Sequence, residues 1–538
     1  MSTELHDAVS EVLHANGVER VFGVLGDANM LYVADFIESG GRYIGGVDER
    51  GAVQMADAYA RISARVGVAT VTHGPGLTNA LTSVVEAVRA RTPLVVLTGD
   101  TPEVRDYIQH IEIASIVGPT GARYRKVRRA EHVVDEVMLA FAQASALNRP
   151  VVLDIPYALL RKEVVVRVGA RPQRAVVQPD ADAIDAALGV VASAKRPLVL
   201  GGRGAALSGA RDDLVAFARA IGAPLGTSLL GRDMFRGEPF DLGVIGTVAH
   251  DVAAETVAAA DCIVAFGAGL NDHTTASRSV TDGRAIVHVD IDLARIGRHA
   301  PVDAAVIGDA RLVARVMTDK LRDAGITPST FCSPALRARL AGRDPGSDFV
   351  DASTDNTLDP RTAMIALNRA FPADRLVVTD IGRFVLAPWR YLHVSHPLDF
   401  IHTGNFGSIG LGIAAAVGVA AADPSRPTLG IVGDGGAMMG LVEFTTAVRH
   451  RLPLVIAVVD DGCYGAEWDR LGEFGADPKH SLIEWPEFAE VARALGGHGL
   501  VARRVEDLDA VGEHVRSGRL PLLVDIKTDP AVQIGSVR

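Results

Sequence analysis

Two acidic turns follow apolar runs in the last third of the chain. Gly433-Asp434-Gly435-Gly436 follows the run 429–432, and Asp460-Asp461-Gly462 follows the run 454–459. The spacing suits one strand–helix–strand unit, which returns the chain to a neighbouring strand end. Both Asp434 and Asp461 can then reach one ion, with the Cys463 carbonyl as a third ligand. A lone Asp-Gly turn is usually a capping element, but this pair predicts a Mg²⁺ site, because Mg²⁺ prefers oxygen ligands and bridges carboxylates to phosphates.

Glycines surround the first acidic turn. Gly435 and Gly436 stand where a predicted strand gives way to a predicted helix. Without side chains there, a phosphate can approach the backbone N–H groups and the positive end of the helix. Because a carboxylate would repel that phosphate, a divalent cation must lie between them. The turns therefore predict a site for a metal-bound phosphate compound.

The first and last thirds of the chain resemble each other. Segment 66–100 aligns without a gap on segment 426–460 at an offset of 360 positions. Identical positions include Gly76, Ala87, Val88, Arg89, Arg91, Pro93, Leu94, Val95 and Asp100, which match Gly436, Ala447, Val448, Arg449, Arg451, Pro453, Leu454, Val455 and Asp460. Similar patterns occur in unrelated α/β units, but identities at this density favour duplication. Two such domains can hold one ligand between them.

The paired turns resemble the signature of thiamine diphosphate enzymes, and the similarity covers the whole chain. The family is the one that contains acetohydroxyacid synthase, pyruvate decarboxylase and benzoylformate decarboxylase. The resemblance implies two cofactors, thiamine diphosphate and Mg²⁺. The family often has Asn at the second ligand position, where this chain has Asp461. The added negative charge implies tighter metal dependence or help from a nearby cation such as Arg383.

The resemblance also implies which residues contact the cofactor. Glu49, in "VDERGAVQMADAYAR", is the carboxyl group that hydrogen-bonds the pyrimidine and relays a proton. In "TGNFGSIGLG", Gly407 offers a carbonyl to the pyrimidine, and Ile409 wedges between the rings. At the offset of 360, Ile409 falls on Glu49. The implied cofactor contacts are Glu49, Gly382, Arg383, Gly407, Ile409, Gly433, Asp434, Gly435, Gly436, Asp461 and Tyr464.

Five residues are candidates for the substrate side of the site. Asp27, His110 and Glu467 resemble the acid/base residues of family decarboxylases, and Gln109 resembles a glutamine of the synthases. His73 replaces a small residue of the family's "TSGPG" loop. Taken singly, each residue is more simply structural. Together they favour decarboxylation of a 2-oxo acid with release of an aldehyde. Ligation to a second carbonyl, acyloin or dione cleavage, and a flavin-linked oxidase stay open as alternatives.

The middle of the chain bears on flavin and nicotinamide cofactors. "LGGRGAAL" (200–207) resembles the flavin-contacting stretch of acetohydroxyacid synthase, but in "FGAGLNDH" Gly269 stands where that enzyme has Arg, so FAD binding is doubtful. The G-x-G-x-x-G fingerprint of a nicotinamide dehydrogenase is incomplete here. A cofactor-binding protein without catalysis is disfavoured because Glu49 is present.

Apolar runs and helical patterns alternate through the chain and must position these residues. Ten runs predict strands: 66–72, 93–99, 150–156, 197–202, 262–269, 285–292, 376–382, 429–435, 454–461 and 521–527. Continuous apolar runs are typical of parallel strands covered on both faces. We therefore expect an α/β fold of three doubly wound domains: a pyrimidine-binding domain at 1–165, a Rossmann-like central domain at 185–335 and a duplicated diphosphate- and Mg²⁺-binding domain at 355–538. The linkers between them are predicted near 165–185 and 330–360.

Composition limits the partners. The formal net charge of −11 argues against nucleic acid as the main partner. Three scattered cysteines favour a reducing compartment. The N-terminus lacks a signal-peptide pattern, and the longest apolar stretch, 411–422, is shorter than the ~18 residues of a membrane span. We expect a cytoplasmic homodimer or homotetramer with sites at subunit interfaces and a small 2-oxo acid or carbonyl substrate.

Overall fold

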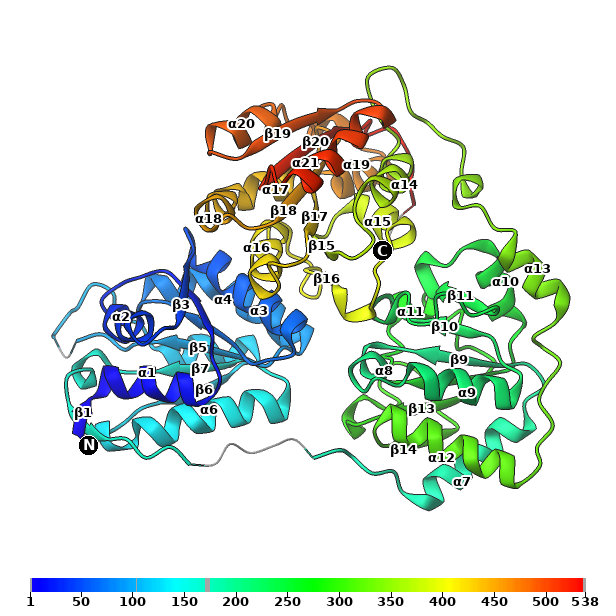
Figure 1. The fold of residues 1–538 in the computed structure, drawn as a ribbon, viewed down its shortest axis with the longest axis horizontal. Coiled ribbons are helices and arrows are strands. Elements are labelled where there is room, and N and C mark those ends of the chain that lie inside the picture. The colour runs from blue at the N-terminus through cyan, green and yellow to red at the C-terminus, as the bar shows by residue number, and fades with distance from the viewer. Residues whose placement is uncertain (1, 103, 170–174, 536–538) are drawn as a thin grey trace.

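Three parallel sheets of six strands each form the frame of the protein (Figure 1). The computed structural model describes residues 2–102, 104–169 and 175–535. The N-terminal and central domains lie on opposite sides of the C-terminal domain, which stands between and above them in the view of Figure 1. The expected α/β class with mainly parallel sheets is confirmed.

The first and third sheets share one topology, which confirms the duplication. Their strand orders are β3-β2-β4-β5-β7-β6 and β16-β15-β17-β18-β20-β19. The strands of the first are β2 (Arg20–Gly23), β3 (Arg42–Gly45), β4 (Gly67–Thr70), β5 (Leu94–Thr98), β6 (Arg123–Lys126) and β7 (Val151–Asp154); those of the third are β15 (Leu376–Thr379), β16 (Phe400–His402), β17 (Thr428–Gly433), β18 (Leu454–Asp460), β19 (His498–Ala502) and β20 (Leu522–Lys527).

The offset of 360 holds across the aligned segment but not outside it. Helix α4 (Pro75–Ala90) corresponds to α17 (Asp434–Gly440) and α18 (Phe444–His450), and both helical segments end at an arginine in the left-handed conformation, Arg91 and Arg451. By contrast, α3 (Glu49–Ser63) corresponds to α16 (Gly412–Ala422), whose first residue lies 363 positions further along the chain and whose last residue lies 359 positions further along. The loop before α16 is longer than the loop before α3. Ile409 precedes α16, whereas Glu49 is the first residue of α3, and the equivalence of these two residues stays a prediction.

The central sheet has the order β11-β10-β9-β12-β13-β14, which is the Rossmann order and confirms that expectation. Its strands are β9 (Pro197–Gly201), β10 (Leu225–Thr227), β11 (Asp241–Val244), β12 (Cys262–Phe266), β13 (Ala285–Asp290) and β14 (Ala304–Ile307). A separate antiparallel pair, β1 (Ser2–Glu4) and β8 (Glu163–Val165), ties the N-terminus to the end of the first domain.

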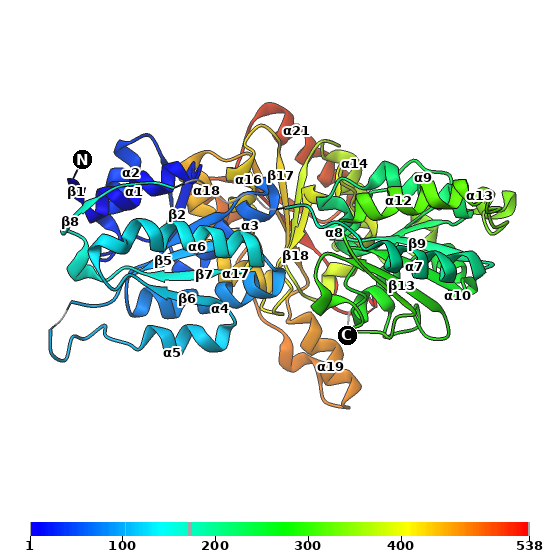
Figure 2. The same cartoon turned by 90° about the horizontal axis from the view of Figure 1, so that it is seen from below.

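Helices cover both faces of each sheet (Figure 2). The remaining helices are α1 (Leu5–Ala15), α2 (Met30–Glu38), α5 (Ile113–Val117), α6 (Val133–Leu147), α7 (Ala181–Ser193), α8 (Arg203–Leu207), α9 (Arg211–Ile221), α10 (Asp251–Ala259), α11 (Asp272–Thr275), α12 (Ala310–Asp323), α13 (Pro334–Ala341), α14 (Pro360–Ala370), α15 (Leu386–Tyr391), α19 (Gly465–Glu473), α20 (Phe488–Ala494) and α21 (Asp509–Ser517). Helix α19 projects from the body of the molecule in Figure 2 and buries none of its residues.

The N- and C-terminal domains share one hydrophobic core, built around the contact of α3 with α16. Helix α16 has the sequence GIAAAVGVAAA and is buried along nearly its whole length. Its small residues let the two helix backbones approach closely: a Cβ added at Gly418 would lie 2.1 Å from the Met55 carbonyl oxygen. The helix is apolar on every side because protein surrounds it.

The segments between the domains differ in part from the prediction. The expected linker at 165–185 lies partly outside the described residues. The expected linker at 330–360 contains α13, where Pro334 occupies the first turn and Ser333 caps the helix by accepting from the Leu336 amide. The proposed domain boundaries fall between the three sheets. Among the described residues, no helix is both long and apolar enough to cross a bilayer.

Candidate active site

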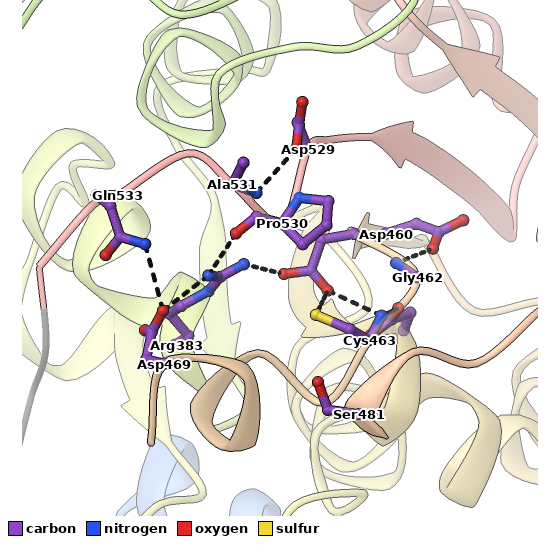
Figure 3. A network of polar contacts seen from close by, with 12 residues as sticks. Arg383, Asp460, Gly462, Cys463, Asp469, Ser481, Asp529, Pro530, Ala531 and Gln533 are labelled. Carbon is purple, nitrogen blue, oxygen red and sulfur yellow. Dashed lines mark hydrogen bonds and ion pairs between the residues drawn. The ribbon is translucent and has the colours of Figure 1, made fainter. Parts of the chain in front are cut away.

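The two acidic turns converge at the ends of neighbouring parallel strands. β17 pairs with β18, and Asp434 and Asp461 follow these strands. The amide of Cys463 lies 3.2 Å from Asp434 Oδ2 and 3.3 Å from Asp461 Oδ1. Two carboxylates that share one N–H donor are close enough to share one cation. Figure 3 shows the second of these turns from close by, with Asp460, Gly462 and Cys463 labelled.

The convergence concentrates negative charge in a buried place. Asp434 is only 3% exposed, and it also accepts hydrogen bonds from Trp485 Nε1 at 2.9 Å and the Gly435 amide at 2.7 Å. Burial, together with the charges of Asp461 and Asp460, raises the pKa of Asp434 to about 8. A divalent cation here would remove the repulsion between the carboxylates. The donor set therefore fits the hard, oxygen-liganded ion that the sequence predicts.

Arg383 connects Asp461 to two further segments (Figure 3). Its Nη2 lies 2.6 Å from Asp461 Oδ2, and its Nη1 donates to the Pro530 carbonyl at 2.8 Å and to Asp469 on α19 at 3.1 Å. The guanidinium is 6% exposed. The predicted nearby cation is thus paired with the second predicted metal ligand, and it also holds α19 and the C-terminal segment beside the turn.

The glycines of the first turn have a packing role that the sequence analysis missed. A Cβ at Gly435 would lie 2.5 Å from the ring of Tyr464, and one at Gly436 would lie 2.7 Å from Asp380 Oδ2. Neighbouring side chains therefore fill the space over these two Cα atoms, where we expected room for a phosphate. Their backbone N–H groups still open the helical segment that begins at Asp434.

Asp380 holds the loop 403–411, which carries Gly407 and Ile409. It is fully buried and accepts from Thr403 Oγ1 and from the Gly410 amide, both at 2.8 Å. Between these anchors, Gly407 is exposed with a φ of +81° and open space at its Cβ position. The loop is thus held at both ends and presents Gly407 at the surface.

Glu49 begins α3, at the edge between the N- and C-terminal domains. The preceding residue, Asp48, caps the helix by accepting from the Arg50 and Gly51 amides. The half-buried Glu49 carboxylate accepts one hydrogen bond, from Asn79 Nδ2 at 3.1 Å. Gly76 lies beside it, because an added Cβ there would be 3.5 Å from Glu49 Oε1. Glu49 is therefore positioned by α3 and α4 together.

The structure joins two of the five predicted substrate residues. His73 is 1% exposed, and its Nε2 lies 2.8 Å from Gln109 Oε1. The Tyr107 ring packs edge-on against the imidazole. His73 Nδ1 is buried without a hydrogen-bond partner among the described residues. The pair thus fixes the orientation of the imidazole and leaves one ring nitrogen for another molecule.

The other three predicted substrate residues lie apart. His110 is half-exposed, and its Nδ1 lies 3.1 Å from Thr101 Oγ1 and 4.0 Å from Asp100. Asp27 and Glu467 are exposed. Gly26 packs against Thr72, the residue before His73, so Asp27 lies near the His73 turn. Within the described chain, no hydrogen bond or ion pair links Asp27, His110 and Glu467, so one chain alone does not assemble the predicted acid/base cluster.

Four residues around the site could not be found from the sequence: the buried Asp380, Glu86 and Glu443 and the partly buried Trp485. They contact the predicted site residues or the segments that carry them. Glu86 in α4 and Glu443 between α17 and α18 each stand beside apolar residues, and this is the one signal in the sequence that points to them.

The glycine stretch of the central domain is explained by packing. A Cβ at Gly202 would lie 2.4 Å from the Gly267 carbonyl oxygen, and one at Gly204 would lie 2.7 Å from the Gly267 Cα. These glycines let the turn after β9 pack directly on the turn after β12. They therefore require no flavin to account for them.

Comparison with known proteins identifies the three domains separately. Residues 3–116 match the N-terminal TPP binding domain of thiamine pyrophosphate enzymes, residues 184–317 match the central domain, and residues 380–526 match the C-terminal TPP binding domain. Together these segments cover well over half of the chain. The N- and C-terminal matches contain Glu49 and the Asp434–Asp461 pair, respectively.

Several characterised proteins are similar along almost the whole chain. Sulfoacetaldehyde acetyltransferase of Alcaligenes xylosoxydans xylosoxydans is 29% identical, with 93% of this chain and 88% of the relative covered. Acetolactate synthase isozyme 3 large subunit of Escherichia coli is 28% identical, covering 95% and 92%. An X-ray structure of a Mycobacterium smegmatis protein, whose name assigns it to the thiamin diphosphate-dependent enzymes, superposes with a TM-score of 0.82 at 24% identity and covers 98% of this chain and all of that one.

Proposed function

The chain belongs to the thiamine diphosphate-dependent enzymes, and from this premise we propose that it releases CO₂ from a 2-oxo acid and joins the remaining acyl unit to a second carbonyl compound. Bound thiamine diphosphate supplies the electron sink for breaking the bond beside the carbonyl. The protein supplies binding, orientation and proton transfer around it. The ligation reaction was the first alternative in the sequence analysis.

We assign the cofactor contacts from the geometry of the turns. Asp434, Asp461 and the Cys463 carbonyl would hold Mg²⁺, and the backbone amides after Asp434 would bind the diphosphate. Glu49 would hydrogen-bond the pyrimidine and exchange a proton with it. Arg383 neutralises Asp461, which offsets part of the negative charge that the extra carboxylate brings beside the diphosphate.

The His73–Gln109 pair is the observation on which we base the proposal of ligation rather than aldehyde release. Gln109 fixes the buried imidazole: Nε2 donates to the Gln109 amide oxygen, so Nδ1 of the neutral ring is left to accept from a hydroxyl group of the bound substrate. The three predicted proton donors, in contrast, are exposed or engaged elsewhere. The names of two relatives also favour ligation, because they denote a synthase and an acetyltransferase.

Aldehyde release remains the second candidate. Asp27 and Glu467 are exposed and make no hydrogen bond or ion pair in the described part of the chain. A second chain docked over the site could bring them together, and they would then form the predicted proton-donating cluster. The position of Asp27 beside the His73 turn favours this candidate.

We propose that the working unit is at least a homodimer, in which two chains share each active site. We also propose that the protein works in the cytoplasm. Apolar side chains are exposed around the predicted cofactor residues: Val47 is 50% exposed, Phe406 45% and Val442 46%, with Met438 and Met439 close to these values. Such residues beside Glu49, Gly407 and α17 are typical of a surface that another protein covers. A second copy would place its N-terminal domain against this C-terminal one.

A panel of 2-oxo acids, assayed with and without added aldehydes, tests the reaction. Mass spectrometry of the products should show CO₂ release with acyloins (from aldehyde acceptors) or 2-hydroxy-3-oxo acids (from a second 2-oxo acid) as the main species. Glu467→Gln should leave the ligation product largely unchanged. If free aldehyde dominates and Glu467→Gln suppresses it, the second candidate holds. Oxidised acyl products with bound flavin would refute both.

A further inference from the structure

Glu443 reaches from the C-terminal domain to the backbone in front of Glu49. It lies in the turn after α17 and is 1% exposed. Its Oε1 accepts from the Val47 and Asp48 amides, both at 3.0 Å, and its Oε2 accepts from Thr446 Oγ1 at 2.7 Å. A Cβ at Gly51 would lie 2.3 Å from the same Oε1. The first turn of α3 is therefore built against this carboxylate.

Glu86 makes the reciprocal contact. It lies on α4 of the N-terminal domain and is fully buried. Its Oε2 accepts from the Phe406 amide and its Oε1 from Asn405 Nδ2, both at 2.7 Å. Phe406 directly precedes Gly407. Each domain thus sends one buried carboxylate to the segment that presents the other domain's predicted pyrimidine contacts.

The two contacts obey the pseudo-symmetry of the duplicated domains. At the offset of 360, Ser83 aligns with Glu443 and Glu86 aligns with Thr446. Each helical segment therefore carries one carboxyl and one hydroxyl residue a helical turn apart, in opposite order. The hydroxyls also bind near the interface: Ser83 Oγ donates to the Arg50 carbonyl at 2.8 Å. This reciprocal arrangement is an observation independent of the individual hydrogen bonds.

Burying a carboxylate is costly unless donors compensate it. Here the donors are backbone amides of two loops that would otherwise be loosely held, because Val47 and Phe406 themselves are exposed. A one-ångström shift of Glu49 or of the Gly407 carbonyl would disturb the contacts to the pyrimidine, since catalytic groups must be held close to the productive geometry.

We propose that Glu86 and Glu443 are cross-domain positioning residues, in which Glu443 sets the position of Glu49 and Glu86 sets the position of Gly407 and Ile409. The inference rests on the proposed function, because it assigns these segments to the pyrimidine end of the cofactor. Neither glutamate touches the substrate or reacting atoms. Their task is to hold in place the segments that each chain contributes to the pyrimidine sites.

Length and charge separate positioning from other roles. Glu443→Gln keeps the reach of the side chain, and its amide oxygen can still accept both backbone N–H groups. Its Nε2 can donate to Thr446 Oγ1, whose hydroxyl then turns toward the Gly45 carbonyl, 3.5 Å away. Glu443→Asp keeps the charge but withdraws the carboxylate by one methylene. Positioning therefore predicts that the Gln variant works and the Asp variant fails, whereas a role that needs the charge predicts the reverse order.

The experiment compares Glu443→Gln, Glu443→Asp, Glu86→Gln and Glu86→Asp with the wild-type holoenzyme. Asp359→Asn serves as the matched control, because Asp359 is equally buried but pairs with Arg361 within its own domain. Three quantities are measured: hydrogen–deuterium exchange of peptides containing 47–48 and 405–406, the affinity for thiamine diphosphate by calorimetry with saturating Mg²⁺, and kcat.

Glu443→Asp should speed exchange at 47–48 and lower kcat on the order of 100-fold, while Glu443→Gln and Asp359→Asn stay close to wild type. Glu86→Asp should do the same at 405–406. If the Asp variant at one glutamate fails to fold, the Gln and Asp variants at the other glutamate test the inference. Equal behaviour of Asp and Gln variants, or faster exchange without loss of kcat, overturns the inference. A wild-type chain that binds no thiamine diphosphate refutes the proposed function itself.

Discussion

At the scale of single residues, the pair of Arg383 and Asp461 distinguishes this site. Both side chains are largely buried, at 6% and 14% exposure, and they lie 2.6 Å apart. Asp461 faces Asp434 with Oδ1 and Arg383 with Oδ2. If Asp461 is the second metal ligand, as proposed, its negative charge is tolerated because a fixed guanidinium neutralises part of it.

Breaking this pair from one side should be worse than replacing both partners. Asp461→Asn leaves the Arg383 guanidinium with only Asp469 and the Pro530 carbonyl, and it should lower stability by about 1–3 kcal/mol. The double variant Arg383→Gln/Asp461→Asn should recover part of that loss, since it leaves no guanidinium without its Asp461 partner. Urea unfolding of wild type, the two single variants and the double variant measures the coupling free energy between the two side chains. Additive losses would show that the two side chains do not depend on each other.

At the scale of elements, burial of Glu86 makes the contact between α4 and the loop 403–411 sensitive to pH. Burial raises the pKa of Glu86 to about 7, although Arg61 and the donors at 405–406 act to lower it. Between the ordinary pKa of 4.5 and about 7, the folded protein then binds more protons than the unfolded chain. The free energy of unfolding therefore falls as the pH rises through this window, and the loss persists above it.

Glu86→Gln should remove this dependence. Relative to wild type, the variant should gain stability between pH 5 and pH 8, by about 3 kcal/mol if the whole shift is expressed. Urea midpoints at the two pH values measure the difference. Wild type and variant with parallel pH profiles would mean that Glu86 is ionised at no cost in the folded protein.

The position of a strand in its sheet decides whether the sequence predicts it. All ten predicted strands are interior strands, which are covered on both faces and read as continuous apolar runs. None of the six edge strands was predicted. Edge strand β6, for example, has the sequence RYRK and no fully buried residue. Half-exposed strands carry polar residues for solvent, so their pattern is not distinctive.

The candidate site divides in a similar way. The Asp434–Asp461 pair could be predicted because both carboxylates follow interior strands one unit apart. Glu86 and Glu443 could not, because their partners lie more than 300 residues away and are backbone amides, which leave no mark in the sequence. For the same reason, the packing of the Tyr464 ring over Gly435 became visible only in the fold.

At the scale of the whole molecule, we propose that the site needs more than one chain. Glu49 and Asp434 stand on different domains, and the surface around them exposes Val47, Phe406 and Val442. If the partner's N-terminal domain completes each site, two differently damaged chains can complement each other. A mixture of Glu49→Gln and Asp434→Ala chains should then regain activity, up to about a quarter of wild type for random dimers, from sites in which both contributing domains are intact.

Neither variant alone should show comparable activity. Light scattering of the mixture gives the size of the active species. A fully active monomer, or a mixture that never exceeds the sum of its parts after subunit exchange, would contradict shared sites.

Calorimetric titration of thiamine diphosphate in the presence of Mg²⁺ tests the central claim most directly, namely that the Asp434 turn holds the metal and diphosphate while Glu49 addresses the pyrimidine. We expect the wild-type chain to bind one cofactor per chain and to require Mg²⁺ for this binding. Asp434→Ala should bind neither the cofactor nor Mg²⁺. Glu49→Gln should lose much less cofactor affinity, but its turnover should fall by on the order of 100-fold or more. Unchanged cofactor binding in Asp434→Ala would contradict the account.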